Sequence, residues 1–181
     1  MSALADRWVR WRVPTGYFVA AICFYLARPS VHSLIAGCLV AVFGLAVRAF
    51  AAGYLRKNTV LATSGPYART RNPLYFGSVF LAAGFAIASR SWIVTILLGV
   101  YFSLFYTMTM LRESETLAAL YGEAYAEYAS RVPLFFPSVR AAGGGNGTFS
   151  WSQYLRNREY RATTGAAGAM ALLWLLMRWR G

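Results

Sequence analysis

The stretch W-I-V-T-I-L-L-G-V-Y-F-S-L-F-Y-T-M-T-M-L, residues 92–111, decides the fold, because its 20 residues carry no charge. An apolar run of this length is typical of a helix that crosses a lipid bilayer. On both sides of it, further apolar runs alternate with segments that carry arginine. Several of these runs are shorter than the ~20 residues that cross a bilayer upright. The predicted membrane spans are residues 13–27, 31–52, 74–88, 92–111 and 162–177.

The composition supports a membrane protein, with 58% hydrophobic residues and a mean hydropathy of +0.44. Lys and Arg outnumber Asp and Glu by 18 to 6, a balance that in a water-soluble chain favours binding to nucleic acid. Here the positions of the charges indicate membrane topology instead, and we expect no nucleic-acid partner. Cys23 and Cys38 fall in apolar spans, and the single histidine, His32, falls in a short external connection. We therefore expect neither a disulfide framework nor a metal site.

The basic residues alternate between the two sides of the membrane as the positive-inside rule requires. We therefore expect a multi-pass protein whose N-terminus and two long loops are cytoplasmic and whose C-terminus is outside. Arg48 falls within the second span. The residues on the predicted cytoplasmic side are Arg7, Arg10, Arg12, Arg56, Lys57, Arg69, Arg71, Arg112, Arg131, Arg140, Arg156, Arg158 and Arg161, and those on the outer side are Arg28, Arg90, Arg178 and Arg180.

The order of the spans predicts one integral membrane domain, residues 1–181, with an all-α fold: a polytopic transmembrane helical bundle of about five spans. Tight connections at residues 28–30 and 89–91 would form antiparallel helical hairpins. Apolar residues between Leu117 and Tyr128 recur with the spacing of an amphipathic helix, which we expect on the cytoplasmic membrane surface or as a lid on the bundle. Small residues recur where helices could approach closely, and they predict packing between helices. They are Gly37, Ala41, Gly44, Gly77, Gly84, Gly165 and Ala169.

The stretch T-V-L-A-T-S-G-P-Y-A-R-T-R-N-P-L-Y-F-G, residues 59–77, concentrates polar residues at the predicted cytoplasmic membrane boundary. Polar side chains at such a position are costly unless they have a use. Pro73 is placed to begin the third span, so that backbone N–H groups at this helix start face the loop and suit a carboxylate. The alternative is that Arg71 extends to lipid headgroups and that Tyr67 and Tyr75 form an interfacial aromatic belt.

A second polar cluster, R-E-S-E at residues 112–115, ends the fourth span. Its two carboxylates and its arginine can bind hydroxyl groups or a cationic group. Glu113 and Glu115 are two residues apart and point to different sides of a helix, so at most one of them faces a shared pocket. The alternative is a solvated helix end with local ion pairs.

Together these motifs resemble the isoprenylcysteine carboxyl methyltransferase and phospholipid methyltransferase group of membrane enzymes. The resemblance rests on S-G-P-Y-A-R-T-R-N-P-L-Y-F-G, residues 64–77, followed after one helical hairpin by E-x-x-x-L-x-x-x-Y-G-x-x-Y-x-x-Y, residues 113–128. Val132-Pro133 and Phe136-Pro137 follow in turn. Two motifs in register across a membrane hairpin are specific, whereas either motif alone would be weak.

The resemblance implies a cytoplasm-facing pocket for S-adenosylmethionine within residues 59–137, with a lateral opening to lipid. It also implies that Arg71, Arg112 and Glu113 lie at the reaction centre. Membrane lipids and a lipophilic small-molecule substrate are then the expected partners, while the oligomeric state stays open. The residues implied to line the cofactor site are Thr59, Val60, Leu61, Ala62, Tyr67, Asn72, Pro73, Leu74, Tyr75 and Glu113.

Two residues depart from the family's pattern. Asn72 stands where the family usually has a histidine, and it can hydrogen-bond a carboxylate or a ribose but does not titrate near neutrality. Thr109 stands where the eukaryotic carboxyl methyltransferases have an arginine that contacts the substrate carboxylate, and Arg112, one helical turn further on, is the candidate replacement. Methyl transfer needs in-line positioning and exclusion of water more than acid–base catalysis, so the lack of a histidine does not exclude it.

Three hypotheses about function follow. The first is methyl transfer from S-adenosylmethionine to a lipophilic or amphipathic acceptor at the cytoplasmic membrane face. The acceptor group is a carboxylate, as in prenylcysteine-type substrates, or a phospholipid amine, which would have to lose a proton to Glu113 or Glu115. The second hypothesis is a non-catalytic membrane scaffold or lipid-binding protein that keeps the helical frame. The third is an NADPH-dependent membrane reductase, because membrane sterol reductases share a related helical core.

Overall fold

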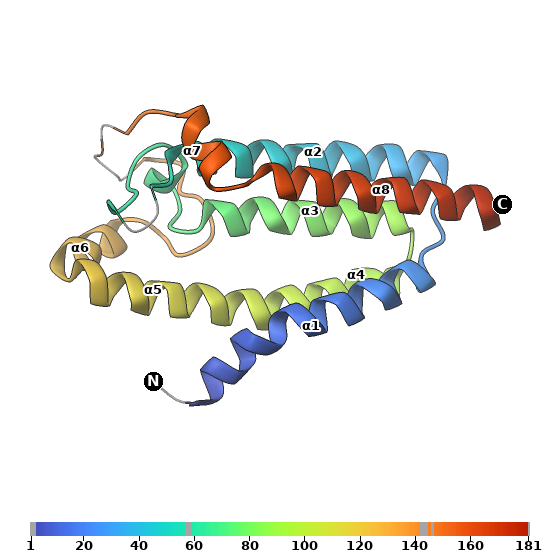
Figure 1. Ribbon diagram of the computed structural model, residues 1–181, viewed down its shortest axis with the longest axis horizontal. Helices are drawn as coiled ribbons and strands as arrows, with labels where there is room; N and C mark the ends of the chain where they lie inside the picture. Colours follow the sequence, from blue (N-terminus) through green and yellow to red (C-terminus); the bar gives the residue numbers. More distant parts are fainter. Residues whose placement is uncertain (1–2, 57–58, 142–144, 146, 181) are drawn as a thin grey trace. The chain divides into compact units, whose positions relative to one another are not determined.

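The structure is a computed structural model that describes residues 3–56, 59–141, 145 and 147–180, without the side chains of residues 3–10 and 12. Lys57 and the side chains of Arg7, Arg10 and Arg12, which belong to the predicted charge asymmetry, lie outside this part. The described residues form helices and loops and contain no strand, so the all-α prediction is confirmed (Figure 1). The helices are α1 (Ala3–Leu26), α2 (Val31–Tyr54), the 3₁₀ helix η1 (Gly65–Ala68), α3 (Pro73–Ser89), α4 (Trp92–Tyr101), the π-helix η2 (Phe102–Tyr106), α5 (Thr107–Tyr121), α6 (Glu123–Arg131), α7 (Trp151–Arg156) and α8 (Tyr160–Arg180).

The predicted spans coincide with helices, but the ends differ. Helix α1 begins at Ala3, well before the predicted start of the first span. The fourth span also continues further than predicted, because α4, η2 and α5 follow one another without a break. Within the described chain, Val31–Tyr54 and Trp92–Tyr121 are long and apolar enough to cross a membrane, while Val13–Leu26 and Pro73–Ser89 are shorter apolar helices. The topology of five spans stays a prediction.

The chain divides into two compact units, each of which is described by itself. The first unit comprises Met1–Val42, Val79–Leu111 and Gly165–Gly181, and the second comprises Phe43–Ser78 and Arg112–Thr164. The organisation as one integral membrane domain stays a prediction.

In the first unit, hydrogen bonds join the two predicted tight connections. The Arg28 N–H donates to the Ser89 carbonyl at 2.8 Å, and the Ser33 hydroxyl donates to the Ala88 carbonyl at 3.1 Å. Ser30 and Ser33 also cap the start of α2 reciprocally. The Ser33 N–H donates to the Ser30 hydroxyl at 3.2 Å, and the Ser30 N–H donates to the Ser33 hydroxyl at 2.9 Å. These bonds fix where α2 begins and bring its start to the end of α3.

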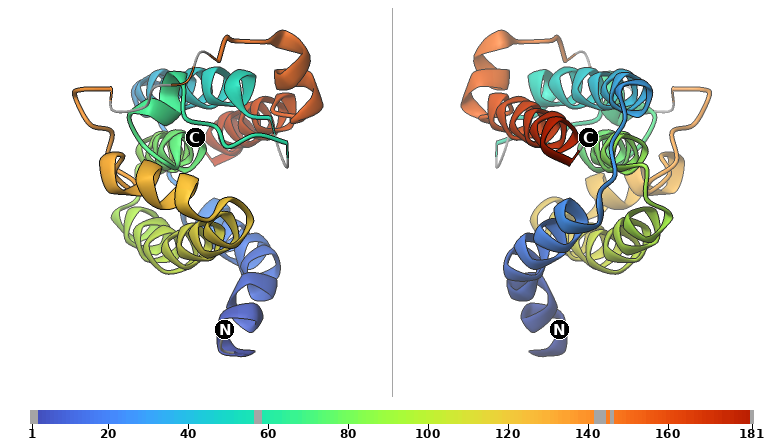
Figure 2. Two further views of the ribbon diagram at one scale, coloured as in Figure 1. Left: turned by 90° about the vertical axis from the view of Figure 1, so that its left-hand side faces the viewer. Right: turned by 90° about the vertical axis from the view of Figure 1, so that its right-hand side faces the viewer.

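Small residues let α2 and α3 approach closely in the first unit. A Cβ atom added at Gly84 would lie 2.6 Å from the Gly37 carbonyl oxygen and 2.9 Å from the Ala41 Cβ, which confirms the packing role predicted for these residues. At Gly165 of α8, by contrast, an added Cβ meets nothing within 4 Å. Helix α1 packs against α4 and η2, alongside which it runs in Figure 2. The buried core of the unit contains Ala27, Leu34, Ala88 and Leu173.

In the second unit, the predicted amphipathic helix is interrupted at Gly122. The φ angle of Gly122 is 53°, a conformation that suits glycine, so the apolar positions lie partly on α5 and partly on α6. Tyr125 and Tyr128 of α6 are buried, and Leu117 and Tyr121 of α5 pack against them. The two short segments therefore cover one small aromatic core, and their position relative to a membrane surface stays a prediction.

Candidate functional site

The loop before α3 and the segment after α6 are joined by hydrogen bonds. The bonds run from the Arg71 N–H to the Pro133 carbonyl (3.0 Å), from the Thr70 hydroxyl to the Phe135 carbonyl (2.8 Å), from Asn72 Nδ2 to the Leu134 carbonyl (2.9 Å), and from the Ser138 N–H to the Arg69 carbonyl (2.8 Å). The first and the last motif of the sequence, some 60 residues apart, are therefore adjacent in the structure.

Asn72 holds the start of α3. It is buried, and besides its bond to Leu134 its carbonyl accepts the Phe76 N–H at 3.0 Å, within the first turn of the helix. Pro73 is the first residue of α3, as predicted, where its missing N–H costs nothing. The side chain that replaces the family's histidine thus has a structural use, and its contact with a cofactor stays a prediction.

The guanidinium group of Arg71 is only partly paired. Its Nη1 donates to the Tyr125 hydroxyl at 3.0 Å, and its Cζ lies 5.9 Å from the centroid of the Tyr125 ring. Its Nε is buried and has no hydrogen-bond partner among the described residues. A buried donor of a charged group costs free energy until a ligand or a water molecule satisfies it. Nε and Nη2 together form the edge that binds a carboxylate with two parallel hydrogen bonds, so this edge is a candidate anion site.

Tyr67 of η1 and Tyr128 of α6 form a buried pair. The Tyr128 hydroxyl donates to the Tyr67 carbonyl at 2.7 Å. Burial raises the pKa of both phenols, and the charge of Glu113 raises the pKa of Tyr67 further. Both hydroxyls are therefore neutral at physiological pH, and since Tyr128 already donates to the Tyr67 carbonyl, the Tyr67 hydroxyl is the one left as a hydrogen-bond donor. The charge of Glu113 thus acts on Tyr67, another predicted site residue.

The second polar cluster lies on α5. Glu113 and Glu115 are both exposed, and Arg112 beside them is half-buried. Of the two carboxylates, Glu113 is the one whose charge raises the pKa of Tyr67, and that at most one of them faces a shared pocket stays a prediction. The catalytic roles of Arg112 and Glu113 stay predictions.

A pocket of about 280 Å³ lies between the end of α2, the residues that follow it, and the segment before α7. Leu61 lines this pocket and also packs against the aromatic core around Tyr125 and Tyr128. A Cβ atom added at Gly145 would lie 2.7 Å from the Thr63 hydroxyl oxygen, so Gly145 lies close to Thr63. The described lining residues are Tyr54, Arg56, Val60, Leu61, Ala62, Thr63, Ser64, Gly145, Gly147 and Thr148.

The predicted cofactor residues therefore fall into two groups. Val60, Leu61 and Ala62 line the pocket, whereas Thr59 is exposed and its hydroxyl donates to the Arg56 carbonyl at 3.1 Å. The second group lies on η1, at the start of α3 and on α5, outside the described lining of the pocket. Leu61 is the residue that connects the groups. The second group consists of Tyr67, Asn72, Pro73, Leu74, Tyr75 and Glu113.

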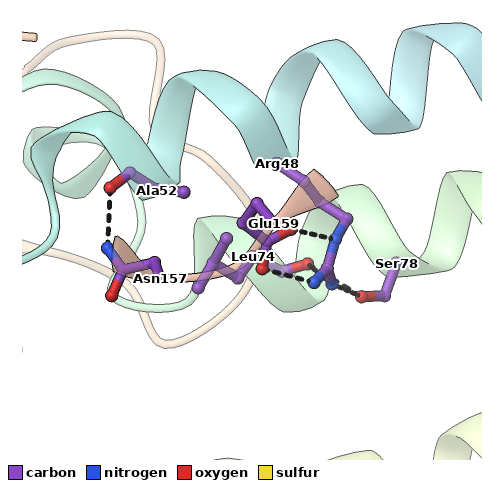
Figure 3. A network of polar contacts seen from close by, with 6 residues as sticks. All are labelled: Arg48, Ala52, Leu74, Ser78, Asn157 and Glu159. Carbon is purple, nitrogen blue, oxygen red and sulfur yellow. Dashed lines mark hydrogen bonds and ion pairs between the residues drawn. The ribbon is translucent and has the colours of Figure 1, made fainter. Parts of the chain in front are cut away.

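A partly buried ion pair near this second group was missed by the sequence analysis. Arg48 of α2 donates from Nε to one carboxylate oxygen of Glu159 at 3.0 Å and from Nη2 to the other at 2.8 Å (Figure 3). The two side chains are 18% and 12% exposed. A charge inside an apolar span is costly unless it is paired, so Arg48 was itself a signal. Glu159 is the one acidic residue after Glu127, and it was the partner to consider.

Metal ligands do not gather in the part of the chain that the structure describes. It contains no group of three or more His, Cys, Asp or Glu side chains that could hold a metal ion, and Cys23 and Cys38 are free thiols.

Comparison with known proteins identifies the family. The sequence profile of the phospholipid methyltransferase family matches residues 31–124, from the start of α2 into α6. The chain belongs to this family, in agreement with the resemblance of its motifs, and it is a membrane protein.

Three relatives show where the chain stands within that group. A cobalt-zinc-cadmium resistance protein of Cupriavidus metallidurans is 34% identical over 155 residues, which cover 81% of this chain and 71% of that protein. A nickel-cobalt-cadmium resistance protein of Alcaligenes xylosoxydans xylosoxydans is 33% identical over 84 residues, 46% of this chain and 39% of that protein. The protein-S-isoprenylcysteine O-methyltransferase of Schizosaccharomyces pombe is 28% identical over 83 residues, 46% of this chain and 35% of that protein. No solved structure matches.

Proposed function

We propose that the chain transfers a methyl group from S-adenosylmethionine to a carboxylate, or to an amine, of a lipophilic acceptor at the cytoplasmic face of a membrane. Family membership and the isoprenylcysteine methyltransferase among the relatives support methyl transfer. The observation that carries the proposal to this site is the buried, unpaired Nε of Arg71. Its free guanidinium edge fits a carboxylate, which belongs either to the acceptor or to the methionine part of the cofactor.

The residues present fit the cofactor. The pocket of about 280 Å³ is close to the lower end of the ~300–1,000 Å³ of small-molecule sites. Val60, Leu61 and Ala62 offer apolar surface to a base, and the Glu113 carboxylate can accept hydrogen bonds from ribose hydroxyls. The neutral hydroxyl of Tyr67 is a further hydrogen-bond donor in the same unit. When it is bound, the cofactor supplies a methyl group that is already electrophilic.

Besides binding the cofactor, the protein needs few further groups for methyl transfer. A carboxylate acceptor is already a nucleophile, so Arg71 has to orient it and the surrounding aromatic side chains have to keep out water. An amine acceptor would in addition need a base, and Glu113 is the carboxylate near Tyr67 that is not engaged with Arg48. If the free edge of Arg71 binds the acceptor and not the cofactor, a carboxylate is the acceptor group that the site favours.

The test is calorimetric titration of the purified chain in lipid nanodiscs with S-adenosylhomocysteine. We expect saturable binding by the native chain and by Arg140→Gln, a variant of an exposed arginine. Arg71→Gln is expected to weaken the binding of either the cofactor or the acceptor about tenfold or more, since a charge-assisted hydrogen bond contributes roughly 1.5–3 kcal/mol. Weaker binding of S-adenosylhomocysteine but not of methylthioadenosine, which lacks the carboxylate, assigns Arg71 to the cofactor. Unchanged binding of both with a higher KM for the acceptor assigns it to the acceptor.

Two other outcomes decide against the proposal. A folded native chain that binds neither S-adenosylhomocysteine nor S-adenosylmethionine at millimolar concentration would leave a membrane scaffold or lipid-binding protein. Binding of NADPH in place of both would favour the reductase hypothesis instead.

A further inference from the structure

Arg48 uses nearly all the donors of its guanidinium group in hydrogen bonds within the protein. Besides the two bonds to Glu159, Arg48 Nη1 donates to the Leu74 carbonyl at 3.2 Å and to the Ser78 hydroxyl. The Ser78 hydroxyl in turn donates to the Leu74 carbonyl at 2.9 Å. Arg48 of α2 therefore holds the first two turns of α3 on one side and Glu159 on the other (Figure 3).

The sequence makes room for this contact. A Cβ atom added at Gly77 of α3 would lie 2.6 Å from Arg48 Cγ and 2.7 Å from the Gly44 carbonyl oxygen. Glycine at this position thus lets the arginine stem pass close to α3 on its way to Leu74. Since Leu74 belongs to the N-P-L-Y part of the motif, the guanidinium group bonds directly to the backbone of a predicted cofactor residue.

The segment between α7 and α8 is attached to α2 at two points. Glu159 is bound to Arg48, and Asn157 Nδ2 donates to the carbonyls of Ala52 and Leu55 at 2.9 Å each, at the end of α2, where carbonyls lack the next helical turn. Arg158 between them has a φ of 55°, a conformation that a residue other than glycine rarely adopts unless its neighbours hold it. This attached segment lies beyond residue 124, where the family match ends.

We infer that Arg48 and Glu159 are positioning residues of the site: Glu159 holds Arg48, and Arg48 holds the first turns of α3, so that the segment before α8 sets the affinity for the cofactor. The inference rests on the proposed function, because the ligand whose affinity is set is S-adenosylmethionine. Neither residue needs to touch the ligand. The charges of Arg48 and Glu159 also act on the Tyr67 hydroxyl, which supports their nearness to the second group of site residues.

If the ion pair served only the stability of the fold, its loss would be expected to affect stability and not ligand binding. Well-packed apolar side chains can replace a buried ion pair without loss of stability, so stability alone does not explain why charges stand here. What an ion pair with two parallel bonds adds is a fixed geometry. If that geometry serves the site, its loss changes the start of α3 and ligand binding more than it changes the fold.

The experiment compares Glu159→Gln with Glu127→Gln in nanodiscs. Glu127 forms a matched ion pair with Arg131 at 2.9 Å, but on the surface, with side chains 72% and 55% exposed. We expect Glu159→Gln to weaken binding of S-adenosylhomocysteine roughly tenfold to a hundredfold, the range that small misplacements of site residues produce. Glu127→Gln is expected to bind like the native chain. Glu159→Asp, which keeps the charge, should recover part of the loss.

Amide hydrogen exchange gives a readout that needs no ligand. The Phe76 N–H, which closes the first turn of α3 on Asn72, should exchange faster in Glu159→Gln than in the native chain and stay unchanged in Glu127→Gln. If Glu159→Gln does not fold, Arg48→Lys keeps the charge but lacks the donors to hold Glu159, Leu74 and Ser78 together, and the same two measurements apply to it. A folded variant with native exchange at Phe76 and native binding overturns the inference. Failure of the native chain itself to bind S-adenosylhomocysteine overturns the proposed function, so the two failures are distinguishable.

Discussion

The side chains of Tyr67 and Tyr128 are both buried, and the burial of these two phenols predicts how stability depends on pH. Burial raises both pKa values above the ordinary value of about 10. The unfolded chain therefore ionises these residues first as the pH rises. Their contribution to the free energy of unfolding is complete below pH ~10 and is lost progressively above it.

The measurement is thermal unfolding in detergent across that range. The fall in stability above pH ~10 should be smaller in the double variant Tyr67→Phe, Tyr128→Phe than in the native chain. At neutral pH, Tyr128→Phe alone should cost about 1 kcal/mol, because the bond to the Tyr67 carbonyl is lost. Tyr17→Phe, at a residue that is 76% exposed, serves as the control. An equally steep fall in the double variant would contradict the assignment.

At the scale of single residues, the sequence pointed to some residues of the candidate site and missed others for an identifiable reason. Arg71 and Asn72 stand inside a dense motif, so their neighbourhood was visible in the local pattern. Arg48 and Glu159 are 111 residues apart and belong to no motif, so nothing local connects them. The unsatisfied charge in an apolar run pointed to a partner, but only the folded chain shows which carboxylate it is.

Among the helices, the close contact of α2 with α3 in the first unit predicts how side-chain size at Gly84 affects stability. Gly84→Ala would place a Cβ 2.6 Å from the Gly37 carbonyl oxygen and 2.8 Å from the Ala41 nitrogen, both backbone atoms that cannot move easily. We expect a loss of about 1–3 kcal/mol, the usual cost of overpacking. Gly165→Ala, where a Cβ meets nothing within 4 Å, should change stability by less than about 1 kcal/mol.

Thermal unfolding of the two purified variants in the same detergent checks this prediction. Equal stabilities would mean that α2 and α3 do not depend on the small residues for their contact. A loss at Gly165 as large as the loss at Gly84 would instead mean that α8 makes a close contact at that position, for example with a second copy of the chain.

The positions of the helices were predictable because each follows from a local pattern of apolar residues and turn residues. Two features were not. The π-helix Phe102–Tyr106 lies inside the uncharged run 92–111, and its own five residues include no glycine or proline that would mark it. The helix breaks at Gly122, although the helical spacing of apolar residues continues on both sides of it. The spacing continues because residues of α5 and α6 pack against the same core. In both cases tertiary packing decides, and periodicity alone does not report it.

For the whole molecule, the sequence predicts an orientation that follows from charge. The net charge is +12, and most of the arginines fall in segments that the five-span topology assigns to one side. A cytoplasmic cofactor can reach the site only if the loops that carry residues 59–72 and 132–150 are on that side. Orientation and proposed function are therefore linked, and a reversed orientation would remove the supply of S-adenosylmethionine.

Single cysteines test this orientation in cells. In a background with Cys23→Ala and Cys38→Ala, Arg140→Cys and Arg178→Cys each place a thiol at an exposed position. We expect a membrane-impermeant maleimide to label Arg178→Cys in intact cells and to label Arg140→Cys only after the membrane is permeabilised. Labelling of both in intact cells, or of neither, would place the two positions on one side and require an even number of spans between them. Labelling of Arg140→Cys alone in intact cells would mean that an odd number of spans separates the two positions but that the orientation is reversed. The orientation predicted from the positive-inside rule would then be wrong.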